Sequence, residues 1–194
     1  METEEKYEGN SETLPKGKAF EDDFTREFIA SEKEVEDGYY EFKSKTGMYT
    51  MLFPRNAIMS KMVYQNPSDT TETLEYYVED DAIAGEINNF RIWHTQREKI
   101  GLEAQLLSVA QHVGYEGDFE KKEDDERIIH MAKMFDELPN RSFLSIFGSV
   151  YSKVSHQNVN YLFTVTYKSG DDELNEKKVE KHVQKLVESI EFSS

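Results

Sequence analysis

The 194-residue chain contains no cysteine. Disulfides, thiolate nucleophiles and cysteine-ligated zinc or iron–sulfur sites are therefore excluded. The absence suits an exported bacterial protein that avoids disulfides, and it suits a cytoplasmic protein equally well. No hydrophobic run approaches the roughly 20 residues that a membrane-spanning helix needs, so the sequence predicts no such helix.

Positive charge is also scarce, because 23 lysines and arginines stand against 39 acidic residues and leave a net charge of −16. Nucleic-acid binding needs clustered basic residues, so we expect no nucleic-acid partner. An anionic membrane surface would not attract such a chain by charge. The charge favours solubility, and it is compatible with a bound cation or a basic protein partner.

Known catalytic motifs are missing from the sequence. The patterns GxSxG, HExxH, GxxxxGK[ST] and GxGxxG do not occur. The histidines lack a close metal-ligand spacing, which is typical of structural or solvated side chains; they are His94, His112, His130, His156 and His182. We expect no catalytic residues, no bound cofactor and no enzyme activity, with an enzyme that uses an unrecognised site as an alternative.

One acidic segment, residues 116–126, is a candidate cation site. Clustered carboxylate oxygens are ligands that Ca²⁺ prefers. The EF-hand pattern is absent and Lys121 and Lys122 interrupt the acidic run, which favours a solvated charged loop over residues 114–126. A calcium-binding or calcium-stabilised module is therefore an alternative function. Its candidate ligands are Glu116, Asp118, Asp124 and Asp125.

Hydrophobic side chains at helical spacing predict three helices. They lie at residues 20–31, at residues 98–113 and near the C-terminus. The C-terminal helix has the clearest stripe, formed by Val179, Val183, Leu186, Val187 and Ile190. Gly114 is expected to end the middle helix.

Alternating hydrophobic side chains predict several strands joined by short turns. One hairpin is expected around the Thr46-Gly47 turn, and its second strand ends at Pro54. Single strands are expected at 74–78 and 87–94. A long hairpin is expected from 142–154 and 159–168, with Leu144, Ile146, Val150 and Val154 on one face of its first strand.

Three further segments carry weaker signals. Asn66 to Asp69 reads as a loop. Residues 127–135 fit a helix or a strand, and a strand is preferred because a turn at Leu138 to Arg141 leads directly into the next strand. Gly148 in mid-strand indicates a bulge or a close backbone approach.

The order of elements predicts an α+β domain with a largely antiparallel sheet covered by helices. Residues 1–18 are polar and are expected to form a flexible tail or linker. Residues 19–194 are expected to form one domain.

The two ends of this region resemble PsbP-like domains. The strand Tyr161 to Tyr167, a following helix and the ending Val187 to Phe192 are similar to the close of those domains, and Tyr49 to Pro54 is similar to an early stretch. As an order of elements, the resemblance covers residues 38–193. It implies an α/β/α sandwich with a central, mostly antiparallel sheet. It also implies accessory or binding proteins, such as the extrinsic subunit of photosystem II and small bacterial lipoproteins.

The leading expectation is a non-enzymatic accessory or protein-binding domain, and specifically an extracytoplasmic bacterial lipoprotein. No signal peptide is visible, since Met1 is followed by Glu2, Thr3, Glu4 and Glu5. The expected contact with a membrane is a lipidated cysteine upstream of the polar tail, outside this sequence. A cytoplasmic protein is the alternative, and the sequence indicates neither the partner nor the oligomeric state.

Overall fold

The computed structural model describes residues 16–78, 87–95, 101–168 and 176–193. The helices are α1 (Lys18–Glu21), α2 (Asp23–Arg26), α3 (Leu102–Val113) and α4 (Glu176–Glu188). The strands are β1 (Tyr39–Lys43), β2 (Tyr49–Pro54), β3 (Ala57–Met59), β4 (Gln65–Ser68), β5 (Thr71–Val78), β6 (Ile87–Thr95), β7 (Glu120–Glu123), β8 (Arg127–Leu138), β9 (Arg141–Ser152), β10 (Asn158–Lys168) and β11 (Glu191–Phe192). These strands pair in antiparallel fashion. The predicted α+β class is therefore confirmed.

The largest layer is an eight-stranded sheet of order β3-β5-β6-β10-β9-β8-β7, with β4 also paired to β5. The predicted long hairpin is confirmed as β9 and β10, where Val150 lies opposite Val159 and Ile146 opposite Phe163. The ambiguous segment 127–135 belongs to strand β8, as preferred. β8 pairs with β9 along its whole length.

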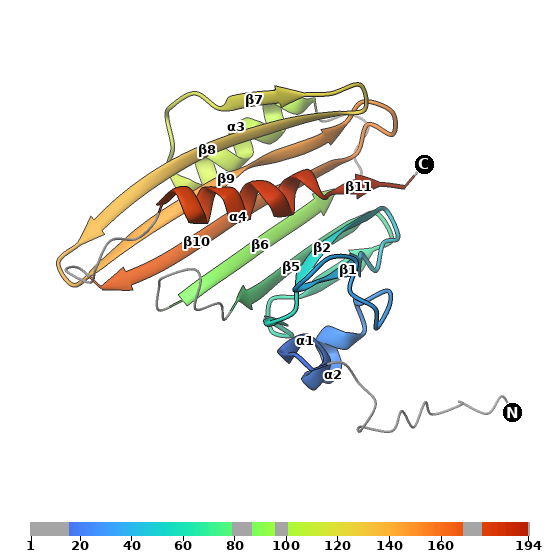
Figure 1. Ribbon diagram of the computed structural model, residues 1–194. Coiled ribbons are helices and arrows are strands. Elements are labelled where there is room, and N and C mark those ends of the chain that lie inside the picture. The colour runs from blue at the N-terminus through green and yellow to red at the C-terminus, as the bar shows by residue number, and fades with distance from the viewer. Residues whose placement is uncertain (1–15, 79–86, 96–100, 169–175, 194) are drawn as a thin grey trace, which may run out of the picture.

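One face of this sheet is covered by α4 and by a small second sheet of order β1-β2-β11. Figure 1 shows α4 lying across the front of the large sheet, with the β1–β2 hairpin beside it. The main hydrophobic core lies between these layers. Its largest fully buried side chains are Tyr40, Tyr49, Tyr76, Tyr161, Phe28, Phe42, Phe53, Phe90, Phe163, Leu74 and Ile92.

The opposite face is partly covered by α3, which lies behind the sheet in Figure 1. Val109 of α3 packs with Phe147 of β9 and Ala132 of β8. Gly114 ends the helix with a left-handed backbone conformation, as predicted (φ 73°). Helices on both faces make the fold an α/β/α sandwich. Residues 98–100 of the predicted helix lie outside the described residues.

The helix predicted at 20–31 is wrong as a single element, because α1 and α2 are separate one-turn helices. Asp22 has an extended backbone, and its carboxylate accepts a hydrogen bond from the Thr25 N–H at 2.7 Å. Asp22 therefore caps α2 and cannot continue α1. Most of the predicted tail, residues 1–15, lies outside the described residues. Within the described part, the structure contains no helix long and hydrophobic enough to cross a membrane.

Three other predictions need correction. The charged loop predicted at 114–126 contains strand β7, because its exposed residues complete the edge of the sheet beside β8. The loop predicted at Asn66 to Asp69 overlaps β4, which joins β5 despite Pro67 because it is an edge strand. Val154 lies beyond the end of β9 and is 70% exposed, so it does not share the buried face of Val150.

Gly148 is the predicted close approach. A Cβ atom at this position would lie 1.8 Å from the His130 carbonyl oxygen and 2.8 Å from the Tyr161 hydroxyl. The missing side chain lets the Tyr161 hydroxyl reach across β9 and donate a hydrogen bond to the His130 carbonyl at 2.8 Å. Glycine is therefore required here by space and not by backbone conformation.

Candidate functional site

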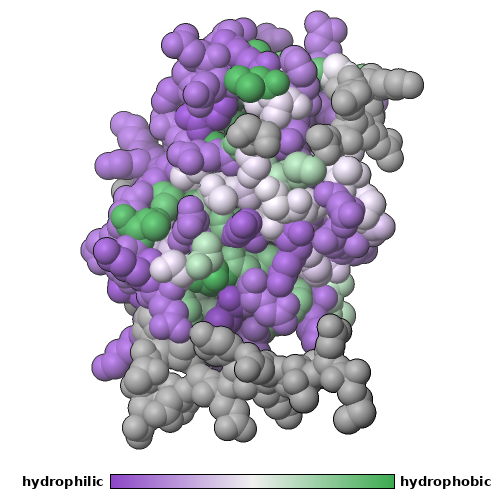
Figure 2. Space-filling model, turned by 90° about the vertical axis from the view of Figure 1, so that its right-hand side faces the viewer, coloured by the Kyte–Doolittle hydropathy of each residue, from purple (hydrophilic) through white to green (hydrophobic). Residues whose placement is uncertain are grey.

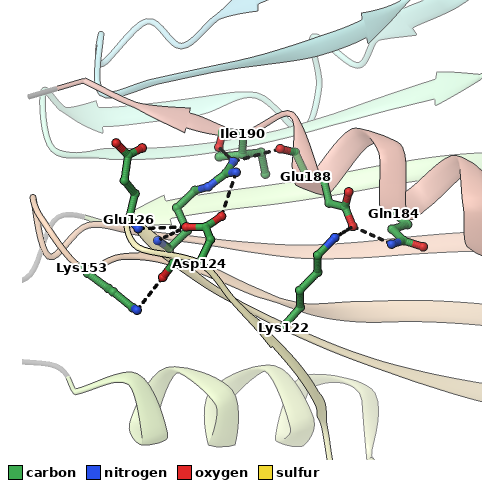
Figure 3. A network of polar contacts seen from close by, with 8 residues as sticks. Lys122, Asp124, Glu126, Lys153, Gln184, Glu188 and Ile190 are labelled. Carbon is green, nitrogen blue, oxygen red and sulfur yellow. Dashed lines mark hydrogen bonds and ion pairs between the residues drawn. The ribbon is translucent and has the colours of Figure 1, made fainter.

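The predicted acidic segment meets the C-terminal end of α4 in a network of polar contacts (Figure 3). One Asp124 carboxylate oxygen accepts hydrogen bonds from the backbone N–H groups of Glu126 at 2.9 Å and Arg127 at 2.7 Å. The other accepts a hydrogen bond from the Arg127 guanidinium at 3.1 Å. The backbone hydrogen bond from Glu126, followed by the hydrogen bonds from Arg127, lowers the pKa of Asp124. Asp124 thus shapes the tight turn between β7 and β8.

Arg127 connects this turn to the end of α4. Its guanidinium donates hydrogen bonds to the backbone carbonyls of Glu188 at 2.9 Å and Ile190 at 2.7 Å. The last carbonyls of a helix have no partner within the helix, and a positive charge near them interacts favourably with the negative end of the helix dipole. Lys122 adds an ion pair to the Glu188 carboxylate at 2.5 Å. The network therefore fixes the C-terminal segment against the β7–β8 hairpin.

The four predicted calcium ligands do not form one cluster. Glu116 and Asp118 precede β7, whereas Asp124 and Asp125 follow it. An extended strand separates the two pairs. Among the described residues, no group of three or more acidic, histidine or cysteine side chains is arranged to hold a metal ion. Calcium binding by this segment stays a prediction.

Two cavities flank the network. The larger has a volume of about 350 Å³ and the smaller about 180 Å³. The larger is lined by Glu126, Arg127, Ser152, Val154, Ser155, Glu191, Phe192 and Ser193. Figure 2 faces this end of the molecule and shows mainly hydrophilic side chains with small, separate hydrophobic areas.

A second polar cluster lies inside the core around Glu72 of β5, which is fully buried. One oxygen of its carboxylate accepts hydrogen bonds from the Ser44 hydroxyl at 2.6 Å and the Tyr49 hydroxyl at 3.1 Å. The other accepts from the Lys45 backbone N–H at 3.0 Å and the Tyr64 hydroxyl at 3.2 Å. Burial and the adjacent Glu72 charge raise the pKa of Tyr49, and they raise that of Tyr64 to about 12. The cluster joins the β1–β2 turn to the large sheet.

His94 lies directly opposite Glu72 on the neighbouring strand β6. It is fully buried, with its ring 5.4 Å from the ring of Tyr49. No hydrogen bond of good geometry reaches either ring nitrogen among the described residues, and the Gln157 side chain beside the ring favours the charged form by less than burial opposes it. Burial therefore lowers the pKa of His94 to about 4.

The same strand β5 places another carboxylate on the opposite face of the sheet. Glu75 is 3% exposed, and the Arg91 guanidinium contacts one of its oxygens through Nε at 2.7 Å and Nη2 at 2.6 Å. The Tyr77 hydroxyl donates to the other oxygen at 2.7 Å. Like Glu72, this carboxylate is satisfied by protein donors, which indicates a structural role.

Sequence reasoning missed both buried glutamates. The signal for Glu72 was present, because the predicted alternation of Leu74, Tyr76 and Val78 extends back by two residues onto Glu72. A carboxylate on the buried face of a strand must find hydrogen-bond donors. Its donors come from distant parts of the chain, so their identity had no sequence signal.

Comparison with known proteins gives one family. The family model YvcA_Mog1p, described as "Putative lipoprotein YvcA", matches residues 15–191. The curated "Putative lipoprotein YvcA" of Bacillus subtilis strain 168 is 30% identical over 192 residues, covering 92% of this chain and 78% of the relative. These matches support the bacterial lipoprotein part of the expected relationship. The resemblance to PsbP-like domains stays a prediction.

Comparison with solved structures gives a protein of similar fold. The Ran-binding protein Mog1p of Saccharomyces cerevisiae is similar with a TM-score of 0.51 and 12% sequence identity, covering 79% of this chain and 94% of that chain. A Bacteroides thetaiotaomicron structure has a TM-score of 0.49 and 13% identity, and this chain spans 48% of its length. At this identity the likeness to Mog1p concerns the fold alone, and it agrees with the α+β sandwich.

Proposed function

Because the chain belongs to the YvcA_Mog1p family, we propose that it is a non-enzymatic, protein-binding domain of a lipoprotein on the outer side of a bacterial membrane. The observation that carries the proposal is the match of one lipoprotein family to residues 15–191, which span almost the whole described fold. The fold-level relative Mog1p is described as a Ran-binding protein, so the same architecture serves to bind a protein elsewhere.

The chemistry of the described polar clusters supports binding over catalysis. The carboxylates of Glu72, Glu75 and Asp124 have their oxygens occupied by hydrogen bonds from the protein itself. A catalytic carboxylate would instead need access to a substrate. These groups hold strands, turns and the end of α4 in place, as expected of a rigid scaffold for a binding surface.

We place the binding surface at the larger cavity, where the β7–β8 turn, the β9–β10 turn and β11 meet. Val154 is 70% exposed there, and Glu126 and Glu191 line the same cavity. Arg127, the basic residue of the lining, is already engaged by Asp124 and the end of α4. Available negative charge beside an exposed hydrophobic side chain suits a basic partner protein.

The lipid anchor is tested in the cell that makes the protein. Cells are grown with an alkyne-labelled fatty acid, and the native protein is purified from membrane and soluble fractions for mass spectrometry of its N-terminus. A labelled N-terminal cysteine upstream of this sequence, found in the membrane fraction, supports the anchor. An unlabelled chain in the soluble fraction contradicts it.

The binding surface is tested separately by cross-linking in living cells. A photo-reactive amino acid replaces Val154 in one variant and Leu107 of α3 in a matched control, since Leu107 is similarly exposed, at 57%. We expect one defined adduct from position 154 that is lost when Glu126 and Glu191 are changed to lysine. Equal adducts from both positions, or an adduct unaffected by the charge reversals, would refute this surface.

A further inference from the structure

The outer edge of β8 is only partly paired. β7 pairs with Ile128 to Met131 of β8, whereas β9 pairs with β8 from Arg127 to Leu138. No strand of the described chain lies beside residues 132–137 on the outer side. Figure 1 shows β7 beside one end of β8, while the arrowhead end forms the margin of the sheet. Such an edge presents backbone donors and acceptors to another strand.

The β8–β9 turn determines which backbone groups point outward. Leu138 and Arg141 flank a two-residue turn, so they form a hydrogen-bonded pair. Hydrogen-bonded and non-hydrogen-bonded pairs alternate along antiparallel strands. The backbone N–H and C=O groups of Lys133, Phe135 and Glu137 therefore point away from β9, toward the open edge.

The side chains of these residues share the face of the sheet that α4 covers. Phe135 is 45% exposed, and its ring lies 5.9 Å from the ring of Tyr167. Lys133 forms ion pairs with Glu180 and, at 3.6 Å, with Glu176, both on α4. Lys133 is thus held on this face, with its backbone available at the edge.

We propose that a second copy of this chain pairs with this edge, antiparallel and about a two-fold axis at Phe135. In that register Phe135 faces Phe135 of the other copy, and Lys133 faces Glu137 twice. Each facing pair uses outward backbone groups, so three pairs with two bonds each give about six hydrogen bonds between the copies. The large sheet would become continuous across the dimer.

The sequence of the edge is self-complementary in this register. Charged residues on an edge strand commonly discourage pairing. Here the residues that face one another carry opposite charges, and the central pair is aromatic, two combinations that stabilise neighbouring antiparallel strands. The net charge of −16 on each copy opposes association, and salt screens it beyond about 8 Å at physiological ionic strength. Symmetric pairing of this kind is the commonest form of oligomer.

The test is the mass of the full chain in solution, measured by light scattering and sedimentation across a concentration series at physiological salt. The monomer has a mass of 22.7 kDa, and the dimer has twice that mass. We expect a concentration-dependent dimer for the wild type. A wild-type protein that stays at the monomer mass over the whole series overturns the proposal.

Charge exchange locates the interface. Glu137→Lys places two lysines opposite each other and Lys133→Glu places two glutamates opposite each other, so each variant alone should be monomeric. Mixed in equal amounts, the two variants should form a heterodimer, because opposite charges then face one another again. Asp136→Lys is the matched control: it makes the same charge change on the opposite face of the strand, opposite Met134, and should still dimerise.

Circular dichroism and thermal melts confirm that each variant is folded before its mass is measured. Dimers that persist in Glu137→Lys, or singly changed variants that fail to recover when mixed although both are folded, would show that the copies meet elsewhere. Either result overturns the β8 interface.

Discussion

Acid should destabilise this protein through the buried imidazole of His94. The His94 imidazole is fully buried beside Tyr49, and the lowering of its pKa by burial exceeds the opposing effect of the Gln157 side chain. Burial holds its pKa at about 4 in the folded protein, compared with about 6.5 in an unfolded chain. A proton therefore binds His94 more readily after the protein unfolds.

The sign and size of the effect follow from proton linkage. Between about pH 6.5 and pH 4 the unfolded chain binds a proton at His94 that the folded chain does not, so the free energy of unfolding falls as the pH falls. At pH 5 the expected loss is about 2 kcal/mol relative to neutral pH, and the full shift corresponds to about 3 kcal/mol. Asp124 and Glu123, whose pKa values are lowered, titrate mainly at more acidic pH.

The assay is urea unfolding of the wild type and of His94→Gln at about pH 7.5 and pH 5. His94→Gln removes the titrating group, so its stability should depend on pH less than that of the wild type, by about 2 kcal/mol between these conditions. His112→Gln changes an exposed histidine of α3 and should keep the wild-type dependence. If His94→Gln loses as much stability at pH 5 as the wild type, the buried imidazole accepts its proton in place and the reasoning is wrong.

Three further predictions concern structural contacts and are checked by urea unfolding. Glu72→Ala should lower the free energy of unfolding by about 3–5 kcal/mol, because it leaves buried donors without an acceptor. A loss of stability no larger than that of a Glu→Ala change at an exposed position would contradict the structural role of the cluster. Gly148→Ala should lower it by about 3 kcal/mol or more because its Cβ meets the His130 carbonyl, whereas at Gly101 an added Cβ meets nothing within 4 Å and the same change should have little effect. Arg127→Met should lower it by about 2 kcal/mol, since the carbonyls of Glu188 and Ile190 lose their donor; an unchanged midpoint would show that water replaces the guanidinium.

Regular elements with a hydrophobic face were predictable from the sequence. The stripe of α4 identified the residues that the helix buries, and the alternation in β9 and β10 identified the central hairpin. In these elements the burial of one hydrophobic face dominates the free energy of folding. Such burial requires hydrophobic residues at regular spacing in the sequence. The one-turn helices α1 and α2 had no such pattern of their own, because a single capping residue, Asp22, decides where one ends and the other begins.

Short edge strands could not be predicted in the same way. Every residue of β7 and β4 is exposed, so neither strand has an alternation of buried and exposed side chains. They form because their backbones pair with the neighbouring strands β5 and β8. This pairing depends on the tertiary arrangement of the sheet and not on the local sequence. Their charged and polar residues resemble those of a solvated loop, which is how the sequence presented them.

The roles of the polar clusters around Asp124 and Glu72 were also not predictable from the sequence. Acidic neighbours in the sequence make Asp124 a candidate calcium ligand, yet its carboxylate is engaged by the turn that it forms and by Arg127. Glu72 has no acidic neighbours that would mark it as a site, yet it accepts hydrogen bonds from β2 and from the β1–β2 turn. A run of charged residues in a sequence is usually solvated by water. A single charged residue on the buried face of a strand must instead find its hydrogen-bond partners within the protein. In this chain the second kind of residue is therefore the better guide to where distant segments meet.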